Sequence, residues 1–401
     1  MTQACDYDLT IIGGGLVGAT LALSLRDSGL RIALVEAVDR QSAAQPSYDD
    51  RTLVLNRVSC AWLHDANLWS AVADAATAIE RIHVSAKGRF GQTQLRASQH
   101  GINEFGFVVQ ARRLGMAMIP AVAAMSECTM FCPAELAHLT VHDGHAEVHL
   151  HCGADSAQQQ SFTTRMVVGA DGAQSKVRHI MGLPAHEYDY QQTAVISNVS
   201  ADQDHQHCAY ERFTDTGPLA LLPHGPGRMG LVWSVAREAA AQLLELNDAE
   251  FLAGLQQRYG YRLGHFKRVG QRTAYPLKLV HVREPVAPRS VLIGNAAHTI
   301  HPISAQGFNL GLRDAVALAQ ALRECAQEDI GSATMLRAYQ STRDEDQLET
   351  IRYTDGLVRL YRHPSALFRF FGSAALLAHQ YVPAMQRRLV TGAMGYRGRA
   401  A

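Results

Sequence analysis

A glycine-rich turn between a short apolar strand and a helical segment constrains the fold of this chain more than any other feature. Residues 8–12 are apolar and rich in β-branched side chains, residues 16–28 have helical spacing, and residues 31–36 form a second strand. Three glycines with G-x-G-x-x-G spacing fill the turn: Gly13, Gly15 and Gly18. The first permits a tight turn, the second lets backbone approach a pyrophosphate, and the third lets the helix pack closely on the strand. We therefore predict a Rossmann βαβ unit whose helix N-terminus binds the phosphates of a dinucleotide.

The second strand ends in an acid, Glu36, which narrows the choice of dinucleotide. A carboxylate at this position accepts hydrogen bonds from a ribose 2′-OH and disfavours a 2′-phosphate, so the site fits FAD or NAD better than NADP. The alternative is a glycine-rich turn in an ordinary α/β sheet. Strand, helix, second strand and terminal acid all occur together here, which favours the Rossmann interpretation.

Two later segments also run from an apolar strand into glycine. A strand at 165–168 leads into Gly-Ala-Asp-Gly at 169–172, and a strand at 290–293 leads into Gly-Asn-Ala-Ala-His at 294–298. A long helix is predicted next, over residues 307–325. Each segment alone is a weak signal. Three such turns in this order indicate a chain that wraps one long dinucleotide, FAD, in three loops, and redox chemistry is then the expected function.

Composition excludes several other classes of protein. Lys plus Arg and Asp plus Glu both number 37, which argues against nucleic acid as the main partner. Seven cysteines give no disulfide framework, and Cys128 and Cys132 lack a second pair at zinc-finger spacing. His298 and His301 have no third ligand near them in sequence, so we predict no metal site. Because there is neither a basic N-terminal cluster nor an apolar run of about 18 residues, we expect a cytoplasmic protein without a signal peptide or spanning helix.

At this point the motifs resemble a known class. G-A-D-G-x-x-S-x-V-R from residue 169 and G-N-A-A-H-x-x-x-P-x-x-x-Q-G-x-N-x-G-x-x-D from residue 294 resemble the FAD aromatic hydroxylases built like p-hydroxybenzoate hydroxylase. The resemblance runs from residue 7 to about residue 355. Within that class, the motifs at 294–297 and 306–311 are similar to the UbiH/UbiF/VisC family of ubiquinone biosynthesis, most of all to its UbiH branch. Members of that branch hydroxylate a 2-polyprenyl-6-methoxyphenol to the 1,4-benzoquinol.

The resemblance implies roles for individual residues. Arg51 is expected near the pyrophosphate or flavin, with a solvated surface charge as the alternative, and Gln110 is a weaker candidate. Asp171 is expected to touch the dinucleotide at the second turn. The residues expected to bind FAD are Gly13, Gly15, Gly18, Glu36, Arg51, Gln110, Asp171, Gly172, Gly294 and Asn295.

The resemblance also places a loop beside the isoalloxazine ring, with Pro302, Gly307 and Asn309 in it, and leaves the catalytic side chains unidentified. The N-terminus of the helix from Gly307 is expected to point at the pyrimidine edge of the flavin, where charge develops on reduction. Asn295 stands where Asp is more common. Because Asn accepts and donates hydrogen bonds and adds no negative charge, we expect FAD to be retained. Ser304-Ala305 replaces the usual Ala-Gly, which leaves the detail of this loop open.

The predicted fold is α/β, with a Rossmann-like FAD-binding domain interrupted by a mixed β-sheet substrate domain and followed by a helical tail. The FAD-binding domain is assigned to residues 1–80, 100–185 and 272–350. The substrate domain takes residues 81–99, with a hairpin expected over 81–96, and residues 186–271, expected as successive strands. Its pocket lining cannot be read from the sequence. The helical tail takes the remaining residues, 351–401.

The resemblance implies that NAD(P)H or another donor reduces FAD and that a flavin C4a-hydroperoxide, formed with O2, transfers oxygen to a polyprenyl phenol. No second Rossmann motif is present for a nicotinamide. Other interpretations stay open: a different ring position, a flavin reductase of the prenyl chain, or a non-catalytic FAD-bound scaffold of a biosynthetic complex. The W-x-W-x-I-P signature of flavin-dependent halogenases is absent.

Residues 351–401 contain eight arginines, no lysine and one acid, Asp355. Basic residues interleaved with aromatic ones favour docking on anionic lipid or on partner proteins, so we expect a peripheral position on the inner face of the membrane. The alternative is a helix that caps the FAD domain with its arginines in water. Pro364 is expected to interrupt an apolar helical stripe, which consists of Leu357, Leu360, Tyr361, Leu367, Phe370 and Phe371.

Overall fold

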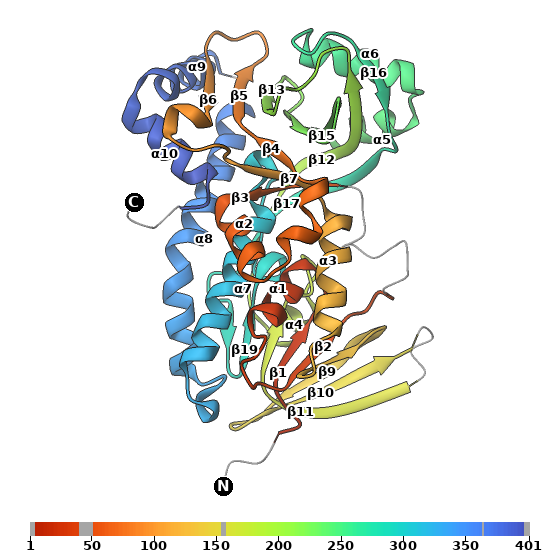
Figure 1. The fold of residues 1–401 in the computed structure, drawn as a ribbon, viewed down its shortest axis with the longest axis vertical. Helices are drawn as coiled ribbons and strands as arrows, with labels where there is room; N and C mark the ends of the chain where they lie inside the picture. Colours follow the sequence, from red (N-terminus) through yellow and green to blue (C-terminus); the bar gives the residue numbers. More distant parts are fainter. Residues whose placement is uncertain (1–4, 40–50, 154–157, 363–364, 397–401) are drawn as a thin grey trace.

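The computed structural model describes residues 5–39, 51–153, 158–362 and 365–396 (Figure 1). A largely parallel sheet and a nine-stranded sheet lie at opposite ends of the molecule, and a small sheet lies between them. The long helix α8 (Ala333–Arg362) runs along one side and connects the two ends.

The N-terminal segment forms the predicted βαβ unit. Strand β1 (Tyr7–Ile12) pairs in parallel with β2 (Ile32–Val35), and α1 (Leu16–Ser24) connects them. The helix was predicted to reach residue 28 but ends at Ser24. The chain then turns through Asp27, whose φ is +60°.

The parallel strands bring the three predicted turns to one edge. Ile12 at the end of β1 lies opposite Gly169 of β11, and Gly169 lies opposite Leu292 of β19. The carboxyl ends of these strands are where α/β sheets bind ligands. The sheet order is β18 (Val286–Ala287), β19 (Ser290–Leu292), β11 (Gln158–Gly169), β1, β2 and β8 (Cys128–Phe131), and β10 (Ala146–Cys152) and β9 (Ala134–Val141) continue from β11 as antiparallel strands.

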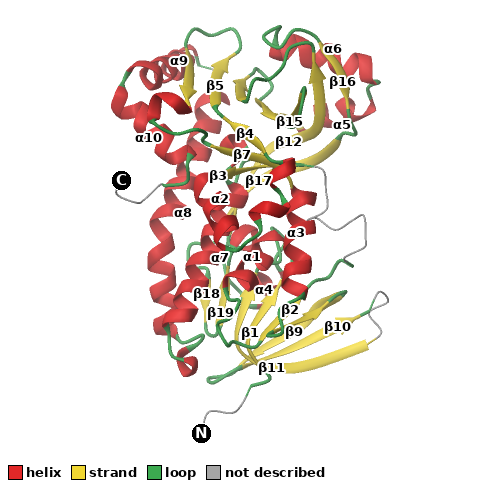
Figure 2. Ribbon diagram, in the orientation of Figure 1, coloured by secondary structure: helices red, strands yellow, loops and turns green. Residues whose placement is uncertain are grey.

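Helices cover one face of this sheet, as the ribbon shows (Figure 2). Apolar side chains of α1, α3 (Ala111–Ala123), α7 (Gly307–Glu324) and the first turns of α8 pack there on Leu9, Ile11 and Leu34. On the other face, β9, β10 and the short α4 (Lys176–Ile180) enclose a second apolar cluster.

The nine-stranded sheet contains all the strands expected of the substrate domain. Two helices, α5 (Arg237–Glu245) and α6 (Asp248–Tyr259), pack on its outer face. The predicted hairpin at 81–96 is present and joins this sheet. The strand order is β20 (His298–Thr299), β17 (Thr273–His281), β12 (His186–Ala201), β15 (Arg228–Ala236), β14 (Pro218–Pro223), β13 (Cys208–Phe213), β5 (Arg81–Ala86) and β6 (Gln92–Arg96), with β16 (Phe266–Val269) on β12.

Two of the predicted domain boundaries differ from the observed elements. The boundary at 272 separates β17 from the nine-stranded sheet, although β17 pairs along β12. The boundary at 351 lies inside α8, which continues without a break to Arg362.

A third, small sheet connects the two ends and consists of β3 (Thr52–Asn56), β7 (Gly106–Gln110) and β4 (Thr77–Ile79), with α2 (Arg57–Asp65) after β3.

The predicted helical tail continues as α9 (Ala366–Tyr381) and α10 (Pro383–Ala393). α9 packs on the substrate sheet, since Thr93 Oγ1 donates to the carbonyl of Leu376 (2.8 Å). Pro364, the predicted interruption, lies outside the described residues. No helix in the described ranges combines the length and apolarity that crossing a bilayer requires. All seven cysteines are free thiols in this structure.

Candidate functional site

The first turn is built so closely that glycine is required at two positions. Gly13 has φ +106°, and a Cβ there would overlap the carbonyl oxygen of Ala170 on the neighbouring turn. A Cβ on Gly18 would overlap the carbonyl oxygen of Gly13. Gly15 is the N-cap of α1 and supplies no side chain, and the first helical turn has no acid. The free N–H groups of this turn can therefore bind a phosphate.

Glu36 lies directly against this turn. Its Oε2 accepts from the backbone N–H of Gly14 (2.8 Å), and its Oε1 accepts from that of Val38 (2.9 Å). The geometry is compatible with the role predicted for Glu36.

The second turn places Asp171 beside the first. A Cβ on Gly13 would lie 2.8 Å from the Asp171 nitrogen. Oδ2 of Asp171 accepts from the backbone of Val177 (3.1 Å), whereas the buried Oδ1 has no partner among the described residues. A buried acceptor without a donor costs free energy, so this oxygen is matched to a donor that a ligand would bring.

Arg178 connects the second turn to the third, a role that the sequence analysis did not assign. Its guanidinium donates to the carbonyls of Ala173 (2.8 Å) and Ala296 (3.0 Å). Its position in the motif after Asp171 was visible in the sequence, but its two carbonyl partners depend on how the turns come together.

The third turn is held against α1 by close packing. Gly294 has φ +58°, and a Cβ there would lie 3.1 Å from Cγ1 of Val17. A Cβ on Gly311 of α7 would lie 2.9 Å from Cγ2 of the same valine. Asn295 is exposed although its neighbours are buried, so its side chain faces open space at this edge.

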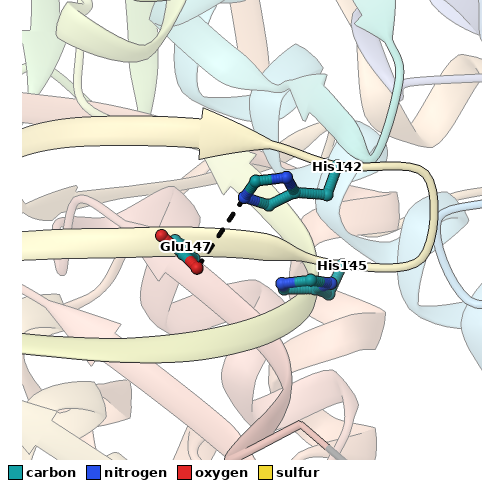
Figure 3. A group of neighbouring side chains, drawn as sticks. All are labelled: His142, His145 and Glu147. Carbon is teal, nitrogen blue, oxygen red and sulfur yellow. Dashed lines mark ion pairs between the residues drawn. The ribbon is translucent and has the colours of Figure 1, made fainter. Parts of the chain in front are cut away.

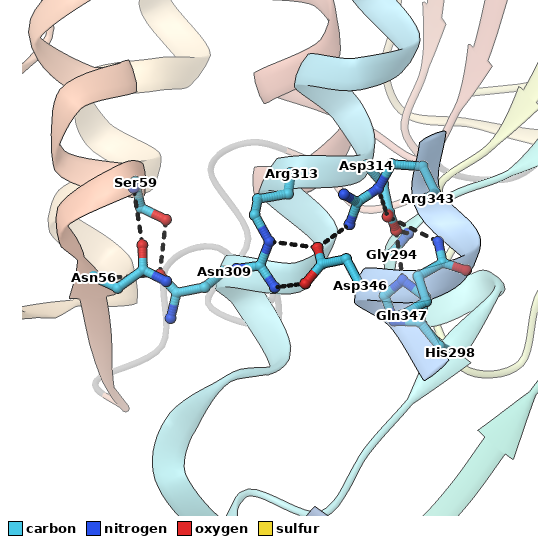
Figure 4. A network of polar contacts seen from close by, with 10 residues as sticks. All are labelled: Asn56, Ser59, Gly294, His298, Asn309, Arg313, Asp314, Arg343, Asp346 and Gln347. Carbon is cyan, nitrogen blue, oxygen red and sulfur yellow. Dashed lines mark hydrogen bonds and ion pairs between the residues drawn. The ribbon is translucent and has the colours of Figure 1, made fainter. Parts of the chain in front are cut away.

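A buried ionic network fixes the third turn to α7 and α8 (Figure 4). At its centre, Asp314 Oδ2 accepts from the Gly294 N–H (3.1 Å) and lies 2.5 Å from Nε2 of His298. Its Oδ1 accepts from Arg343 (2.9 Å) and Gln347 (2.9 Å). His298 is thus the partner of a carboxylate. The sequence motif contained Asp314, but nothing in the sequence marked it as the centre of a network.

This network keeps Asp314 ionised. Burial alone raises the pKa of its carboxyl, but the charges of His298 and Arg343 and the hydrogen bonds from His298 and Gln347 lower the pKa well below its usual value. Arg343 and Arg313 also both donate to Oδ2 of Asp346, each at 2.7 Å. A buried cluster of this kind is costly to break, because removing one member leaves its partners buried without their counter-charge.

Asn309 fixes the loop that was predicted to lie beside the flavin. Its Oδ1 accepts from the Asn56 backbone (3.0 Å) and from Ser59 Oγ (2.7 Å). Its Nδ2 donates to the carbonyls of Val54 (2.7 Å) and Ala305 (3.1 Å). Because these four bonds use the amide fully, Asn309 holds the loop to β3 and has no free donor for a ligand.

The loop itself has an unusual backbone. Ser304 and Ala305 have φ values of +61° and +50°, which side chains with a Cβ rarely adopt. Pro302 and Gly307 are half-buried, and a Cβ on Gly307 would meet only Ile300, at 4.0 Å. The space beside Gly307 is therefore open, and α7 starts there without a side-chain cap.

Arg51 and Gln110, far apart in sequence, come together across the small sheet. Thr52, which follows Arg51, pairs with Gln110, and the Ala111 N–H donates to the Arg51 carbonyl (2.9 Å). The Arg51 guanidinium lies 5.9 Å from the ring centroid of Tyr275 in the nine-stranded sheet. Arg51 thus lies where the two ends of the molecule meet and is not simply a solvated surface charge.

The positions of the histidines bear on the prediction that the chain has no metal site. The described residues include one group whose ligand atoms lie within 4.8 Å of one another, His142, His145 and Glu147 on the β9–β10 hairpin (Figure 3). His142 is exposed and pairs with Glu147 at 3.7 Å. The hairpin lies at the parallel-sheet end, away from the predicted flavin loop. His301 is buried, and burial lowers its pKa to about 3.

Taken together, these residues fit FAD. The N-termini of α1 and α7 have no side-chain cap and no acid in the first turn, so their N–H groups and dipoles are available to phosphates and to the flavin ring. The unsatisfied Oδ1 of Asp171 and the open space beside Gly307 are consistent with the same ligand. Bound FAD would supply the redox chemistry and the reaction with oxygen.

Comparison with known proteins decides the family. Residues 6–352 match the family model described as FAD binding domain. The ubiquinone hydroxylase UbiL of Rhodospirillum rubrum is 32% identical over 92% of this chain and 86% of its own length. The chain belongs to the FAD-binding monooxygenase family. The 3-demethoxyubiquinol 3-hydroxylase of Escherichia coli is 28% identical to this monooxygenase over 97% of the chain and 98% of its own length.

Solved structures confirm the fold. The p-nitrophenol 4-monooxygenase PnpA of Pseudomonas putida superposes with a TM-score of 0.77 at 17% identity, covering 98% of this chain and 99% of its own. A single-residue variant of HpxO from Klebsiella pneumoniae, solved with FAD, superposes with a TM-score of 0.73 at 15% identity, covering 97% of this chain and 98% of its own. The predictions of the p-hydroxybenzoate hydroxylase-type fold, of FAD and of a monooxygenase are thus confirmed.

Proposed function

We propose that this monooxygenase acts in ubiquinone biosynthesis and hydroxylates a polyprenyl methoxyphenol to the 1,4-benzoquinol. The observation that carries the proposal is the similarity, over nearly the whole chain, to proteins named as ubiquinone hydroxylases. The structure adds support, because the sheet beside the flavin loop presents half-exposed apolar side chains, among them Ile196 and Val232. Such a surface suits a prenylated phenol.

The proposed roles of the FAD-binding residues follow from their positions. Gly13, Gly15 and Gly18 let the pyrophosphate approach α1, and Glu36 accepts from the ribose. Asp171 and Gly172 form the second turn, Gly294 and Asn295 the third, and Arg51 with Gln110 closes the site from the small sheet. The helix N-terminus at Gly307 stabilises negative charge on the reduced ring. The protein's work is to orient the phenol and to exclude water around it.

Electrons come from NAD(P)H or another reductant, and O2 is the second substrate. A different ring position is the nearest alternative, because the Escherichia coli relative is named for hydroxylation at position 3. Both ring positions require the same flavin chemistry. They differ in how the phenol is turned in its pocket.

The test is lipid extraction and mass spectrometry of quinone intermediates from cells lacking the protein. We expect a prenyl methoxyphenol to accumulate and to disappear when the gene is restored. Accumulation of a later, already oxygenated intermediate would assign another ring position. Unchanged quinones would refute a required role in the pathway. Incorporation of labelled O2 by purified protein separates the hydroxylase from a prenyl-chain reductase or a non-catalytic scaffold.

We also propose that the tail docks on anionic membrane or on a partner of the biosynthetic complex. The predicted apolar stripe divides in two: Tyr361 is buried and stacks on Phe213, whereas Leu367, Phe370 and Phe371 are 59%, 56% and 53% exposed. Phe90, on the β5–β6 turn, is 54% exposed and lies 6.0 Å from the Phe370 ring. This outward aromatic patch, together with the excess of arginine, supports docking.

A further inference from the structure

One row of side chains crosses the middle of the nine-stranded sheet and stays half-exposed. Glu211 of β13 lies opposite Val84 of β5 and Ala220 of β14. Ala220 lies opposite Val232, and Val232 lies opposite Ile196. Residues directly opposite in a sheet point to the same face. All five are partly exposed, and so are Ile82 and Asn198 on the same face, whereas the other neighbours above and below the row are buried, among them Ala209, Phe213, Gly230, Ser234 and Ala194. Open space therefore lies over this row.

The row faces the flavin loop. A Cβ on Gly230, on the same face, would overlap Thr52 of the small sheet, so this face turns toward the FAD-binding part. Phe213 belongs to the buried cluster that contains Ile303 of the loop. The backbone N–H of Ser304 lies close enough to the Glu211 carboxylate to lower its pKa in part. The strained Ser304 backbone is thus next to the one acid of the row.

Glu211 has apolar neighbours and no counter-charge. Burial raises its pKa to about 7, and the nearby Ser304 N–H opposes this only in part. Among the described residues, no cation pairs with it. Arg212, next in the chain, alternates to the opposite face and donates to Ser85 Oγ (3.1 Å). A carboxylate beside open space and without a cation is unusual in a protein core and is typical of a functional group.

Other ionisable groups of the elements packed on this face are already engaged or neutral. His301 of the loop is neutral at physiological pH, because burial lowers its pKa to about 3. Asp355 of α8 pairs with Arg359 (2.7 Å) and accepts from the Tyr190 hydroxyl (3.1 Å). The Tyr361 hydroxyl donates to the Gly372 carbonyl (3.1 Å). Glu211 is therefore the titratable group of this surface that is left for a ligand.

We propose that Glu211 binds the phenol hydroxyl of the substrate and accepts its proton, with Val84, Ala220, Val232 and Ile196 as the apolar wall for the ring and the start of the prenyl chain. This rests on the proposed function. The phenol O–H bond breaks, the proton moves to a carboxylate oxygen, and the electron pair stays on the phenolate oxygen. The ring becomes electron-rich and reacts more readily with the electrophilic oxygen that the monooxygenase reaction supplies from O2.

The test compares wild-type, Glu211→Gln and Glu238→Gln proteins, all loaded with FAD. Glu238 is an exposed residue of α5 and serves as the matched control. Each protein is reduced with dithionite and mixed with O2 and a 2-methoxy-6-prenylphenol, and the hydroxylated product of one turnover is measured from pH 5.5 to 9. We expect the product-forming rate of Glu211→Gln to fall about 100-fold or more, and its pH dependence near 7 to disappear. The control should match the wild type.

A second measurement keeps the role of Glu211 separate from the proposed function. Phenol affinity for oxidised protein should increase with pH through about 7 in the wild type, because the ionised carboxylate is the better acceptor. It should not change with pH in Glu211→Gln. Unaltered product formation and affinity in that variant, with FAD retained, would overturn the assignment of Glu211. If the wild type makes no hydroxylated phenol, the proposed function fails, and the affinity profile still decides whether Glu211 holds a phenol.

Discussion

Two carboxylates, the fully buried Asp314 and the partly exposed Glu211, show how the dinucleotide edge and the substrate face differ. Asp314 is surrounded by His298, Arg343 and Gln347, and its pKa is lowered. Glu211 has only the Ser304 N–H, and burial raises its pKa to about 7. Paired charges at the dinucleotide edge fix the backbone turns that are proposed to bind FAD. At the substrate face, a charge is left unpaired beside open space, as chemistry on a ligand requires.

The largest expected effect tests the claim that backbone geometry alone forms the dinucleotide edge. In Gly18→Ala, the added Cβ would overlap the Gly13 carbonyl, so the turn must open and FAD binding should be lost. The matched control is Gly356→Ala, also in a helix, where a Cβ meets nothing within 4 Å. Flavin absorbance of the purified proteins is the measurement. A yellow Gly18→Ala protein with normal FAD content would refute the assigned turn.

Next in size is the loss of the charge at the centre of the network. Asp314→Asn should lower the free energy of unfolding by about 3 kcal/mol, because Arg343 and His298 stay buried with less counter-charge. The exposed Asp344→Asn on α8 is the control. Since the folded pKa of Asp314 lies below the ordinary 3.8, its contribution is full above about pH 4 and is lost as the pH falls further. The difference in the free energy of unfolding between the variant and the wild type should therefore be smallest at the lowest pH.

For Glu211, the change in stability with pH should have the opposite sign. Its folded pKa of about 7 exceeds the ordinary 4.5, so the folded state loses stability as the pH rises between these values. Glu211→Gln should therefore be more stable than wild type at pH 8, by up to about 3 kcal/mol, and equally stable near pH 4. Thermal unfolding of both proteins at the two pH values is the measurement. A variant less stable than wild type at pH 8 would show that Glu211 has a counter-charge.

The same difference explains what could be predicted from the sequence. Glycine spacing and strand ends report backbone geometry directly, so the βαβ unit and the strand ends that lead into the three turns were predicted, whereas the small sheet and the antiparallel strands β9 and β10 were not. Glu211 lies in the segment predicted as successive strands, but its proposed role depends on strand register and on the approach of Ser304, far away in sequence. Likewise, Asp314 becomes the network centre only when α8 brings Arg343 beside it. Long-range packing of this kind leaves no local pattern.

The boundaries at 272 and 351 differed from the observed elements for a related reason. β17 follows the substrate strands in the chain and pairs back along β12, which a linear division cannot show. α8 serves both ends of the molecule: Met335 and Leu336 pack under the parallel sheet, and Val358 and Tyr361 pack under the nine-stranded sheet. Its unbroken helical pattern offers no point of division.

The smallest expected effect concerns the tail, where exposed aromatic residues are proposed to meet a membrane. Phe370→Ser combined with Phe371→Ser should weaken binding to vesicles with anionic lipid about 10- to 100-fold, since each ring that enters the membrane surface contributes about 1 kcal/mol. FAD content should stay normal because both rings point outward. Tyr261→Ser, which removes an aromatic residue 67% exposed in the loop after α6, is the control. If the double variant floats with the vesicles as well as the wild type does, the patch does not bind the membrane and a protein partner is the remaining ligand. The substrate sheet would then receive its prenyl phenol from that partner rather than from the bilayer.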